Sequence, residues 1–336
     1  MFAEAIEDIL RDRCTPAVVR AVEAGSSPDE LWDVFASGGF LDLLKPEAEG
    51  GAGLPLGDLY MVLAHFGRYA VPVPLAQSIA ARALVAPAVS LPTGLLTIAP
   101  ALQRRANGSI TCPLVPFGTI SQHVLAAEGN ELLLLDAGNA RRESTGVPNS
   151  QVATLNWGDD GTVGRLMGNA AALPPLAAAA HAALLAGAMA RIFDMTLQYC
   201  NDRVQFGKSL GKFQVVQHQL SVMAEEVAAA SMAAEAAFQT SARTPATLPA
   251  AMAKARASEA ALSVANTAHA LHGAIGITRE YDLQLLTRRL HEWRIAHGSE
   301  TYWNRLVGEQ ILASGSTLCE FICADQTMHC ASPDGR

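Results

Sequence analysis

Residues 203–234 read RVQFGKSLGKFQVVQHQLSVMAEEVAAASMAA. The second half of this stretch places apolar or small residues at successive spacings of four, three, four, three and four: Val216, Leu220, Met223, Val227, Ala230 and Ala234. Such spacing puts all of them on one face of a long α-helix. The alanines keep that face narrow, so neighbouring helices can approach closely. The stretch therefore predicts a long helix inside a packed helical bundle.

Helical patterning continues on both sides of this stretch, from about residue 174 to residue 314, and alanine dominates the sequence there. Alanine has the highest helix propensity, and long helices with short connections are typical of a four-helix bundle. We therefore expect a C-terminal four-helix bundle over residues 166–315. Residues 316–336 are expected to form a tail.

Upstream of the bundle, the apolar period changes to that of strands. Ser109–Val115 and Val152–Leu155 read as strands, and two apolar runs flank Gly129-Asn130 as in a tight hairpin. Residues 96–165 are therefore predicted to form a small, mostly antiparallel β domain. Residues 1–95 read as helices, one of them beginning near Asp58. The predicted fold is an α+β multidomain protein with helices, a β domain and a bundle in that order.

Composition narrows the function classes. The chain has 336 residues, a formal net charge of −8 and 50% hydrophobic residues. No run of lysine or arginine occurs, so nucleic-acid binding is not expected. The acidic, amphipathic N-terminus does not resemble a signal peptide, and the apolar run Leu176–Ala190 is too short to span a bilayer comfortably. A cytoplasmic protein without a membrane segment is expected.

Cysteine usage favours reduced thiols. The chain has six cysteines scattered along its length, whereas disulfide frameworks belong to short secreted chains. One group near the C-terminus has the composition of a metal site: Cys319, Cys323, His329 and Cys330. Its spacing fits no usual zinc pattern, so no metal is expected.

Three local stretches resemble one family. Arg203–Gln214 resembles the Arg-x-Gln-Phe-Gly…Phe-Gln signature of acyl-CoA dehydrogenases, and His272–Glu280 resembles their His-Gly-Gly-x-Gly-x-Thr-x-Glu turn. Gly38-Gly39-Phe40 and the loop 46–53 resemble their N-terminal loop. The order and spacing of these stretches extend the resemblance over nearly the whole chain.

The resemblance implies FAD as cofactor, with the first motif reaching toward FAD held mainly by a neighbouring subunit. Arginine offers a planar, permanently charged donor fork to a pyrophosphate, and glycine lets a backbone approach it closely. The implied cofactor-binding residues are Arg203, Gln205, Phe206, Phe213, Gln214, Gly273 and Ser299. Two alternatives stay open. Arg203 could pair with a surface carboxylate while Phe206 joins the core, and the His272 turn could be a plain helix end.

The sequence departs from the family pattern in the His272 turn, at both base positions and in the β domain. Ala270 and Ala274 stand where many members carry glutamine and a second glycine. The usual catalytic glutamate is replaced by His297, 23 residues after Ala274 (297 − 274). The other base position of the family, near Ala177, also lacks a carboxylate. Between residues 95 and 123, about twenty residues and the usual flavin-facing motifs of the β domain are missing relative to the family.

The α,β-dehydrogenation of an acyl-CoA that the resemblance implies needs a general base. One hypothesis is a dehydrogenase subunit that works with a homologous partner carrying the glutamate, on bulky thioesters such as sterol side-chain acyl-CoAs. A second is a homo-oligomer that uses His297 as base, although a packed structural histidine is an alternative reading of that residue. A third is a structural subunit without flavin. Electron-transferring flavoprotein is the acceptor that the resemblance implies.

Overall fold

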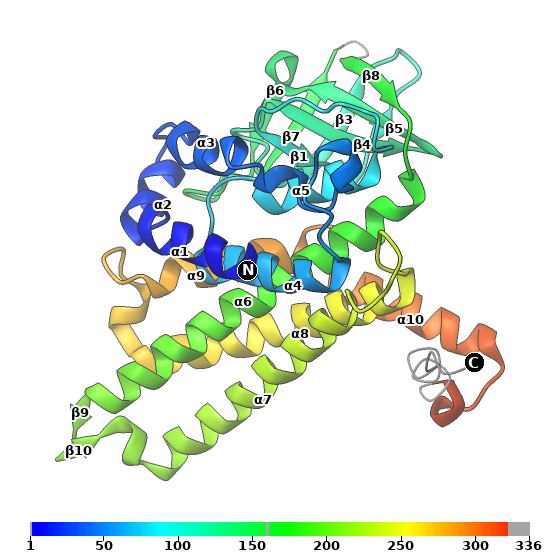
Figure 1. The fold of residues 1–336 in the computed structure, drawn as a ribbon. Helices are drawn as coiled ribbons and strands as arrows, with labels where there is room; N and C mark the ends of the chain where they lie inside the picture. The colour runs from blue at the N-terminus through cyan, green and yellow to red at the C-terminus, as the bar shows by residue number, and fades with distance from the viewer. Residues whose placement is uncertain (1, 159–160, 322–336) are drawn as a thin grey trace.

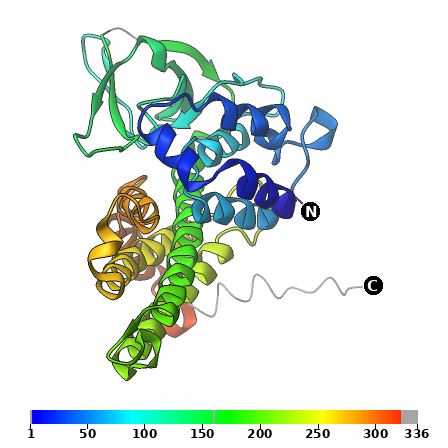
Figure 2. The same cartoon turned by 90° about the vertical axis from the view of Figure 1, so that its left-hand side faces the viewer.

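The computed structural model describes residues 2–158 and 161–321. The two sheets lie above the bundle and beside part of the N-terminal helical region, and the bundle extends away from the sheets (Figures 1 and 2). The N-terminal helices are α1 (Phe2–Arg13), α2 (Pro16–Glu23), α3 (Asp29–Ser37), η1 (Phe40–Asp42), η2 (Glu47–Glu49), α4 (Leu56–Arg68) and α5 (Leu75–Leu84).

The β region consists of two four-stranded sheets packed face to face. One has the order β1 (Leu96–Ile98), β4 (His123–Glu128), β5 (Glu131–Asp136), β8 (Thr162–Leu166). The other has the order β2 (Gln103–Arg104), β3 (Ile110–Val115), β7 (Ala153–Trp157), β6 (Arg141–Ser144). Their inward residues form one buried cluster that includes Leu133, Leu155 and Trp157. Such facing layers are how two half-apolar sheets bury their inner surfaces.

The strand predictions are confirmed, and the structure adds one parallel pair of strands. Glu128 pairs with Glu131 across the tight turn at Gly129-Asn130, as the hairpin prediction required. All described strand pairs within these two sheets are antiparallel except β1 with β4, which is parallel. The parallel pair arises because a long excursion, containing β2 and β3, separates the two strands in sequence.

The bundle contains α6 (Leu173–Asp202), α7 (Gln214–Ala236), α8 (Thr247–His272), α9 (Leu283–Ile295) and α10 (Glu300–Ser314). The predicted seam of α7 is confirmed, since Val216, Leu220, Met223, Ala230 and Ala234 are buried and Val227 packs against the core. A short hairpin of β9 (Val204–Gln205) and β10 (Lys208–Ser209) connects α6 to α7 at the bundle end farthest from the sheets (Figures 1 and 2).

Helix α6 is the central helix of the protein. It packs against α4, α7, α8 and α9, and its first half is buried on all sides. By length and composition the segment Ala170–Asp202 could cross a membrane, but 83% of its most apolar window is buried inside the protein. Its apolar surface is therefore used for packing against other helices.

Two glycines allow α4 and α6 to touch backbone to backbone. A Cβ atom at Gly187 would lie 1.8 Å from the carbonyl oxygen of Ala64, and one at Gly67 would lie 2.0 Å from that of Leu184. Real Cβ atoms do not approach oxygens so closely, so only glycine fits at either position. This crossing joins the N-terminal helices to the bundle.

Candidate functional site

The two family-like motifs meet at the tip of the bundle. Arg203 and Gln205 follow the end of α6, and Gly273 and Ile275 belong to the turn η6 (Gly273–Ile277) after α8. Together with Tyr199 they line a pocket of about 420 Å³. Tyr199 stacks on His272 with ring centroids 4.5 Å apart, which holds the ends of α6 and α8 together. Segments about 70 residues apart in sequence (273 − 203) thus form one site.

Arg203 is available to a ligand in this pocket. It is exposed, and no ion pair or side-chain hydrogen bond joins it to any other residue in the described ranges. Its backbone is fixed, because its N–H donates to the Tyr199 carbonyl at 2.8 Å and its carbonyl accepts from Leu210 at 2.9 Å. The alternative in which Arg203 pairs with a surface carboxylate is therefore wrong for this structure. An unpaired guanidinium fits a pyrophosphate oxygen well.

Phe206 projects from the hairpin turn into solvent. Its side chain is 90% exposed, so the alternative that places it in the core is also wrong. Phe206 and Gly207 both have positive φ, 52° and 81°, which is the geometry of a type I′ hairpin turn. A bulky residue rarely adopts this conformation, and such strain is concentrated at functional positions. The turn therefore exposes the Phe206 ring to solvent, where a ligand or another subunit can contact it.

Gly273 has the conformation that a close backbone approach requires. Its φ is 63°, and a Cβ atom there would meet nothing within 4 Å, so the space above it is open. Phe213 and Gln214 lie just beyond, at the start of α7, and Lys208 sits 4.3 Å above the Phe213 ring. Open space above Gly273 and the unpaired guanidinium of Arg203 are compatible with the phosphates of FAD. Ser299 lies elsewhere, at the N-terminus of α10.

His297 lies in a second, larger cavity between the β region and the end of α9. The cavity measures about 620 Å³, and its walls include Leu114, Phe117, Trp293 and Ile295. The ring of His297 lies 4.8 Å from that of His181, at an interplanar angle of 43°. Only 7% of His297 is exposed, and its Nε2 has no hydrogen-bond partner among the residues that the structure describes.

His297 is a poor general base. Burial, then the neighbouring His181 and Lys254, hold the pKa of His297 well below its ordinary value. The ring is therefore neutral at physiological pH, and its affinity for a proton is low. A base that must remove the α-proton of a thioester needs a pKa closer to neutrality. The lowered pKa of His297 weighs against the hypothesis of a homo-oligomer that uses His297 as its base.

No free carboxylate replaces the missing glutamate at this cavity. Glu300 is bound to Arg294, and Glu292, the single carboxylate among the described lining residues, lies 3.3 Å from Arg289. At the other base position of the family, Ala177 and Ala178 are buried alanines. The cavity therefore lacks an unpaired acid in the part of the chain that the structure describes.

Lys254 fixes the turn that carries His297, and sequence reasoning missed it. Its side chain is fully buried in α8, and Nζ donates to Ser258 Oγ at 2.9 Å and to the carbonyls of Arg294 at 2.7 Å and Gly298 at 3.0 Å. Burial, opposed by Glu300, lowers the pKa of Lys254 to about 7. The sequence did carry a sign of this role, because a single lysine stands among the alanines of α8. A position on the buried face of such a helix is normally apolar.

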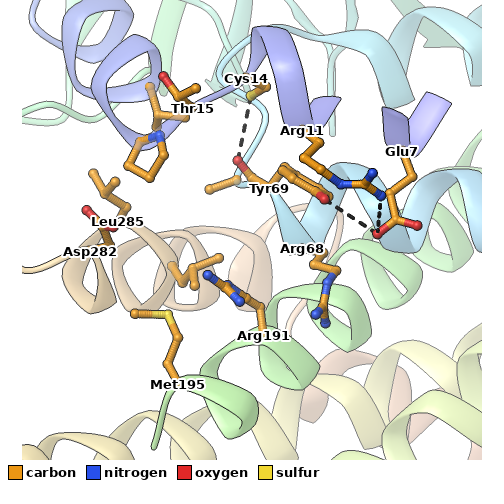
Figure 3. Close-up of a pocket in the computed structure, with 14 residues that line it drawn as sticks. Glu7, Arg11, Cys14, Thr15, Arg68, Tyr69, Arg191, Met195, Asp282 and Leu285 are labelled. Atoms are coloured by element: carbon orange, nitrogen blue, oxygen red, sulfur yellow. Dashed lines mark hydrogen bonds and ion pairs between the residues drawn. The ribbon is translucent and has the colours of Figure 1, made fainter. Parts of the chain in front are cut away.

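A further pocket, of about 440 Å³, lies between the N-terminal helices and the bundle (Figure 3). Some of its polar groups pair with one another: Arg11 pairs with Glu7, and Cys14 donates to the Tyr69 carbonyl at 3.7 Å. Burial raises the pKa of the Cys14 thiol to about 12, so it is not a nucleophile at neutral pH. This pocket offers no catalytic group.

The C-terminal metal candidate falls almost entirely outside the described residues. Cys323, His329 and Cys330 lie beyond residue 321, and Cys319 is exposed. Within residues 2–158 and 161–321, no three His, Cys, Asp or Glu residues are placed to hold a metal ion.

The chain matches the acyl-CoA dehydrogenase N-terminal domain over residues 1–91 and the C-terminal domain over residues 176–312. It therefore belongs to the acyl-CoA dehydrogenase family, whose members are oxidoreductases acting on CH–CH bonds. It is 32% identical over 302 residues to acyl-CoA dehydrogenase IpdE2 of Mycolicibacterium smegmatis, covering 87% of this chain and 91% of that protein. Identity to IpdE2 of Mycobacterium tuberculosis is 31% over 298 residues, covering 87% and 90%.

Solved structures of the family share the fold. The ChsE4–ChsE5 complex from Mycobacterium tuberculosis superposes with a TM-score of 0.80 at 23% identity, over 92% of this chain and 96% of that chain. The Tcur3481–Tcur3483 steroid ACAD gives 0.77 at 27% identity, over 93% and 97%. Butyryl-CoA dehydrogenase from Megasphaera elsdenii gives 0.77 at 20% identity, over 93% and 97%. The predicted fold class is confirmed.

The buried histidines should make the protein sensitive to acid. Burial, then Lys254, lowers the pKa of His181 from 6.5 to about 3, so the unfolded chain binds the proton more tightly than the native chain. The stabilisation is complete above pH 6.5 and is lost as pH falls toward 3. The free energy of unfolding should drop by about 2 kcal/mol at pH 5 from this group alone. Urea unfolding between pH 7 and pH 5 measures the loss.

The matched variant is His181→Leu, which removes the titrating ring from the same position in α6. Its free energy of unfolding should fall less steeply with pH than that of the native chain, even where the variant is less stable overall. Equal slopes in the two proteins would show that His181 protonates as readily in the native state as in the unfolded state.

Proposed function

We propose that this chain is a subunit of an FAD-dependent acyl-CoA dehydrogenase that introduces an α,β double bond into an acyl-CoA thioester. A homologous partner subunit supplies the catalytic carboxylate. The observation that carries the proposal is the contrast between the two sites. The tip pocket offers the unpaired Arg203 and the open space at Gly273 to a ligand, with Phe206 exposed on the adjoining hairpin, whereas the described residues that line the cavity at His297 include no free carboxylate.

The residues of the chain have a binding role in this scheme. Arg203 would donate to the FAD pyrophosphate, and the open backbone at Gly273 would admit the phosphates. Phe206 would cover an apolar part of the cofactor, with Gln205 and Gln214 beside its polar edges. When bound, FAD supplies the hydride acceptor for the β-carbon. The α-proton would go to the partner's carboxylate, because neutral His297 is a weak base.

The relatives support a heteromeric arrangement. The ChsE4–ChsE5 and Tcur3481–Tcur3483 structures each pair two different chains, and the second is a steroid ACAD. We therefore propose bulky thioesters, such as sterol side-chain acyl-CoAs, as substrates, and electron-transferring flavoprotein as the electron acceptor. The homomeric alternative would require His297 to take the proton.

Flavin content tests the proposal. Purified alone, the chain should be nearly colourless, and after co-expression with a homologous subunit that carries glutamate at the position of His297 the complex should absorb in the flavin bands. In that complex, Arg203→Ala should weaken FAD binding about ten- to a hundredfold, because it removes a charge-assisted hydrogen bond. Arg141→Ala is the control, since Arg141 is 81% exposed on the β region, in none of the pockets described.

Each result bears directly on the scheme. A yellow chain that is bleached by an acyl-CoA without any partner would overturn the need for a second subunit. A complex that forms but takes up no flavin would favour the structural-subunit alternative. Unchanged FAD affinity in the Arg203→Ala complex would remove the tip pocket from the cofactor site.

A further inference from the structure

The pocket of Figure 3 lies apart from both sites of the proposed function. It measures about 440 Å³, and none of its lining residues belongs to the tip pocket or to the cavity at His297. Its walls come from α1, α2, α4, α6 and α9, so it lies where the N-terminal helices meet the bundle (Figure 3). Its volume lies within the range of small-molecule pockets.

Arg191 of α6 brings an unpaired positive charge to this pocket. It is exposed, and no ion pair or side-chain hydrogen bond joins it to another residue within 2–158 and 161–321. Tyr281 lies near enough for Arg191 to lower its pKa, but burial above all raises that pKa above its ordinary value. The phenol is therefore neutral at physiological pH, and it provides no counter-ion for Arg191.

The two carboxylates that line the pocket already have partners. Asp282 pairs with Arg20 at 2.5 Å. Glu7 accepts a hydrogen bond from the Tyr69 hydroxyl at 3.4 Å and lies 4.0 Å from a guanidinium nitrogen of Arg11. Neither carboxylate is within ion-pair distance of Arg191. The counter-ion of Arg191 must therefore come from outside the described residues.

The remaining polar groups of the wall offer hydrogen-bond donors. Arg68 pairs with Asp194 at 2.9 Å, and a bidentate carboxylate occupies only two of the five N–H donors of a guanidinium. Thr15 Oγ1 accepts from the Val18 N–H at 3.4 Å, and its own proton has no acceptor in the part of the chain that the structure describes. The free hydrogen-bonding capacity of the pocket therefore suits a ligand that accepts.

The deep side of the pocket is apolar. Val19, Leu285 and Leu286 line it and are 1%, 3% and 4% exposed. An apolar ring or chain gains free energy by leaving water for this surface. Arg191 matches a single carboxylate, because a guanidinium binds the two oxygens of a carboxylate in one plane. A doubly charged ligand gains less, because two carboxylates stand in the same wall.

We propose that this pocket binds an ionised carboxylic acid with a small apolar body. The carboxylate pairs with Arg191, and the apolar body lies against Val19 and Leu285. Binding is reversible and forms no covalent bond. The site goes beyond the proposed function, because it requires neither FAD nor a partner subunit. The ligand contacts both the N-terminal helices and the bundle, so it links these two regions.

The test compares three ligands with one benzene ring on the purified chain by isothermal titration calorimetry at low salt. Benzoate should bind about tenfold more tightly than benzamide, its neutral analogue of similar shape, because only benzoate forms a charge-assisted pair with Arg191. Phenyl phosphate, which carries more negative charge, should bind no more tightly than benzoate. Equal affinities of benzoate and benzamide, no binding of benzoate, or tighter binding of phenyl phosphate would overturn the proposal.

Two variants locate the carboxylate. Arg191→Met removes the guanidinium at an exposed position without a partner, where folding is not at risk, and should weaken benzoate about tenfold while benzamide binds as before. Arg243→Met is the matched control. Arg243 is also exposed, has no ion pair among the described residues and lies outside this pocket, so its loss should change neither affinity. A preference for benzoate that survives Arg191→Met, or that is lost in Arg243→Met, would place the carboxylate elsewhere.

The outcome is independent of the flavin experiment. Calorimetry on the colourless chain shows whether the pocket takes a carboxylate, and absorbance in the flavin bands shows whether a complex carries FAD. A chain that binds no benzoate contradicts only the pocket proposal. A yellow chain that prefers benzoate contradicts only the requirement for a partner.

Discussion

Replacing Gly187 with alanine should lower the free energy of unfolding by roughly 3 kcal/mol. The new Cβ would lie 1.8 Å from the Ala64 carbonyl oxygen of α4, and that atom belongs to a helix backbone that cannot rotate away. Helices α4 and α6 would have to move apart along a crossing that includes Leu63 and Leu184. Alanine is more favourable than glycine inside a helix by about 1 kcal/mol. The free-energy cost of the clash is larger than this gain, so the net effect is destabilising. Urea denaturation of the native and variant chains measures the difference.

The matched control is Gly308→Ala in α10. A Cβ atom at Gly308 meets nothing within 4 Å, so only the propensity gain remains. This variant should be more stable than the native chain by about 0.5–1 kcal/mol. If both variants were stabilised, α4 and α6 would not touch at these glycines in solution.

Glu23→Ala should destabilise the chain by about 3 kcal/mol, the second largest effect expected. The Glu23 side chain is 1% exposed and pairs with Arg288 and with Arg289, whose Nη2 lies 2.9 Å from Glu23 Oε1. That oxygen is an ion-pair partner although it forms no hydrogen bond. Arg289 is 3% exposed, so removing the carboxylate leaves a buried charge with weaker compensation from Gln151. The pair also joins α2 to α9.

An exposed ion pair provides the comparison. Glu143 lies 3.5 Å from Arg141 on the surface of the β region and is 51% exposed. Glu143→Ala should change the free energy of unfolding by less than about 0.5 kcal/mol, because water solvates both charges. Similar losses for Glu23→Ala and Glu143→Ala would mean that the Glu23 carboxylate is hydrated in the native chain.

Local patterns predicted the elements well. The α7 seam, the hairpin at Gly129-Asn130 and the strand at Ser109–Val115 were all readable, because each depends on the period of apolar residues or on turn residues that are adjacent in sequence. The parallel pairing of β1 with β4 could not be predicted from the sequence. Parallel partners are connected by long segments, so no local turn signals them.

The site was predictable in part. Arg203, Phe206 and Gly273 were identified by motif resemblance, and the structure brings them to one tip of the bundle. Lys254 was missed because two of its three acceptors, the carbonyls of Arg294 at the end of α9 and of Gly298 after it, lie 40 and 44 residues away in sequence. The lowered pKa values of His181 and His297, and the packing of the two rings, likewise depend on which helices become neighbours.

The sequence by itself determined which elements form, which family the chain resembles, and that no glutamate stands at the position of His297. These properties depend on residue type and local spacing. Only the tertiary structure decided which polar groups have a partner within residues 2–158 and 161–321: Arg203 and His297 Nε2 have none there, and Glu300 is bound by Arg294. The physical reason is that burial and pairing depend on contacts between residues far apart in sequence. Those contacts exist only after the helices and sheets have packed.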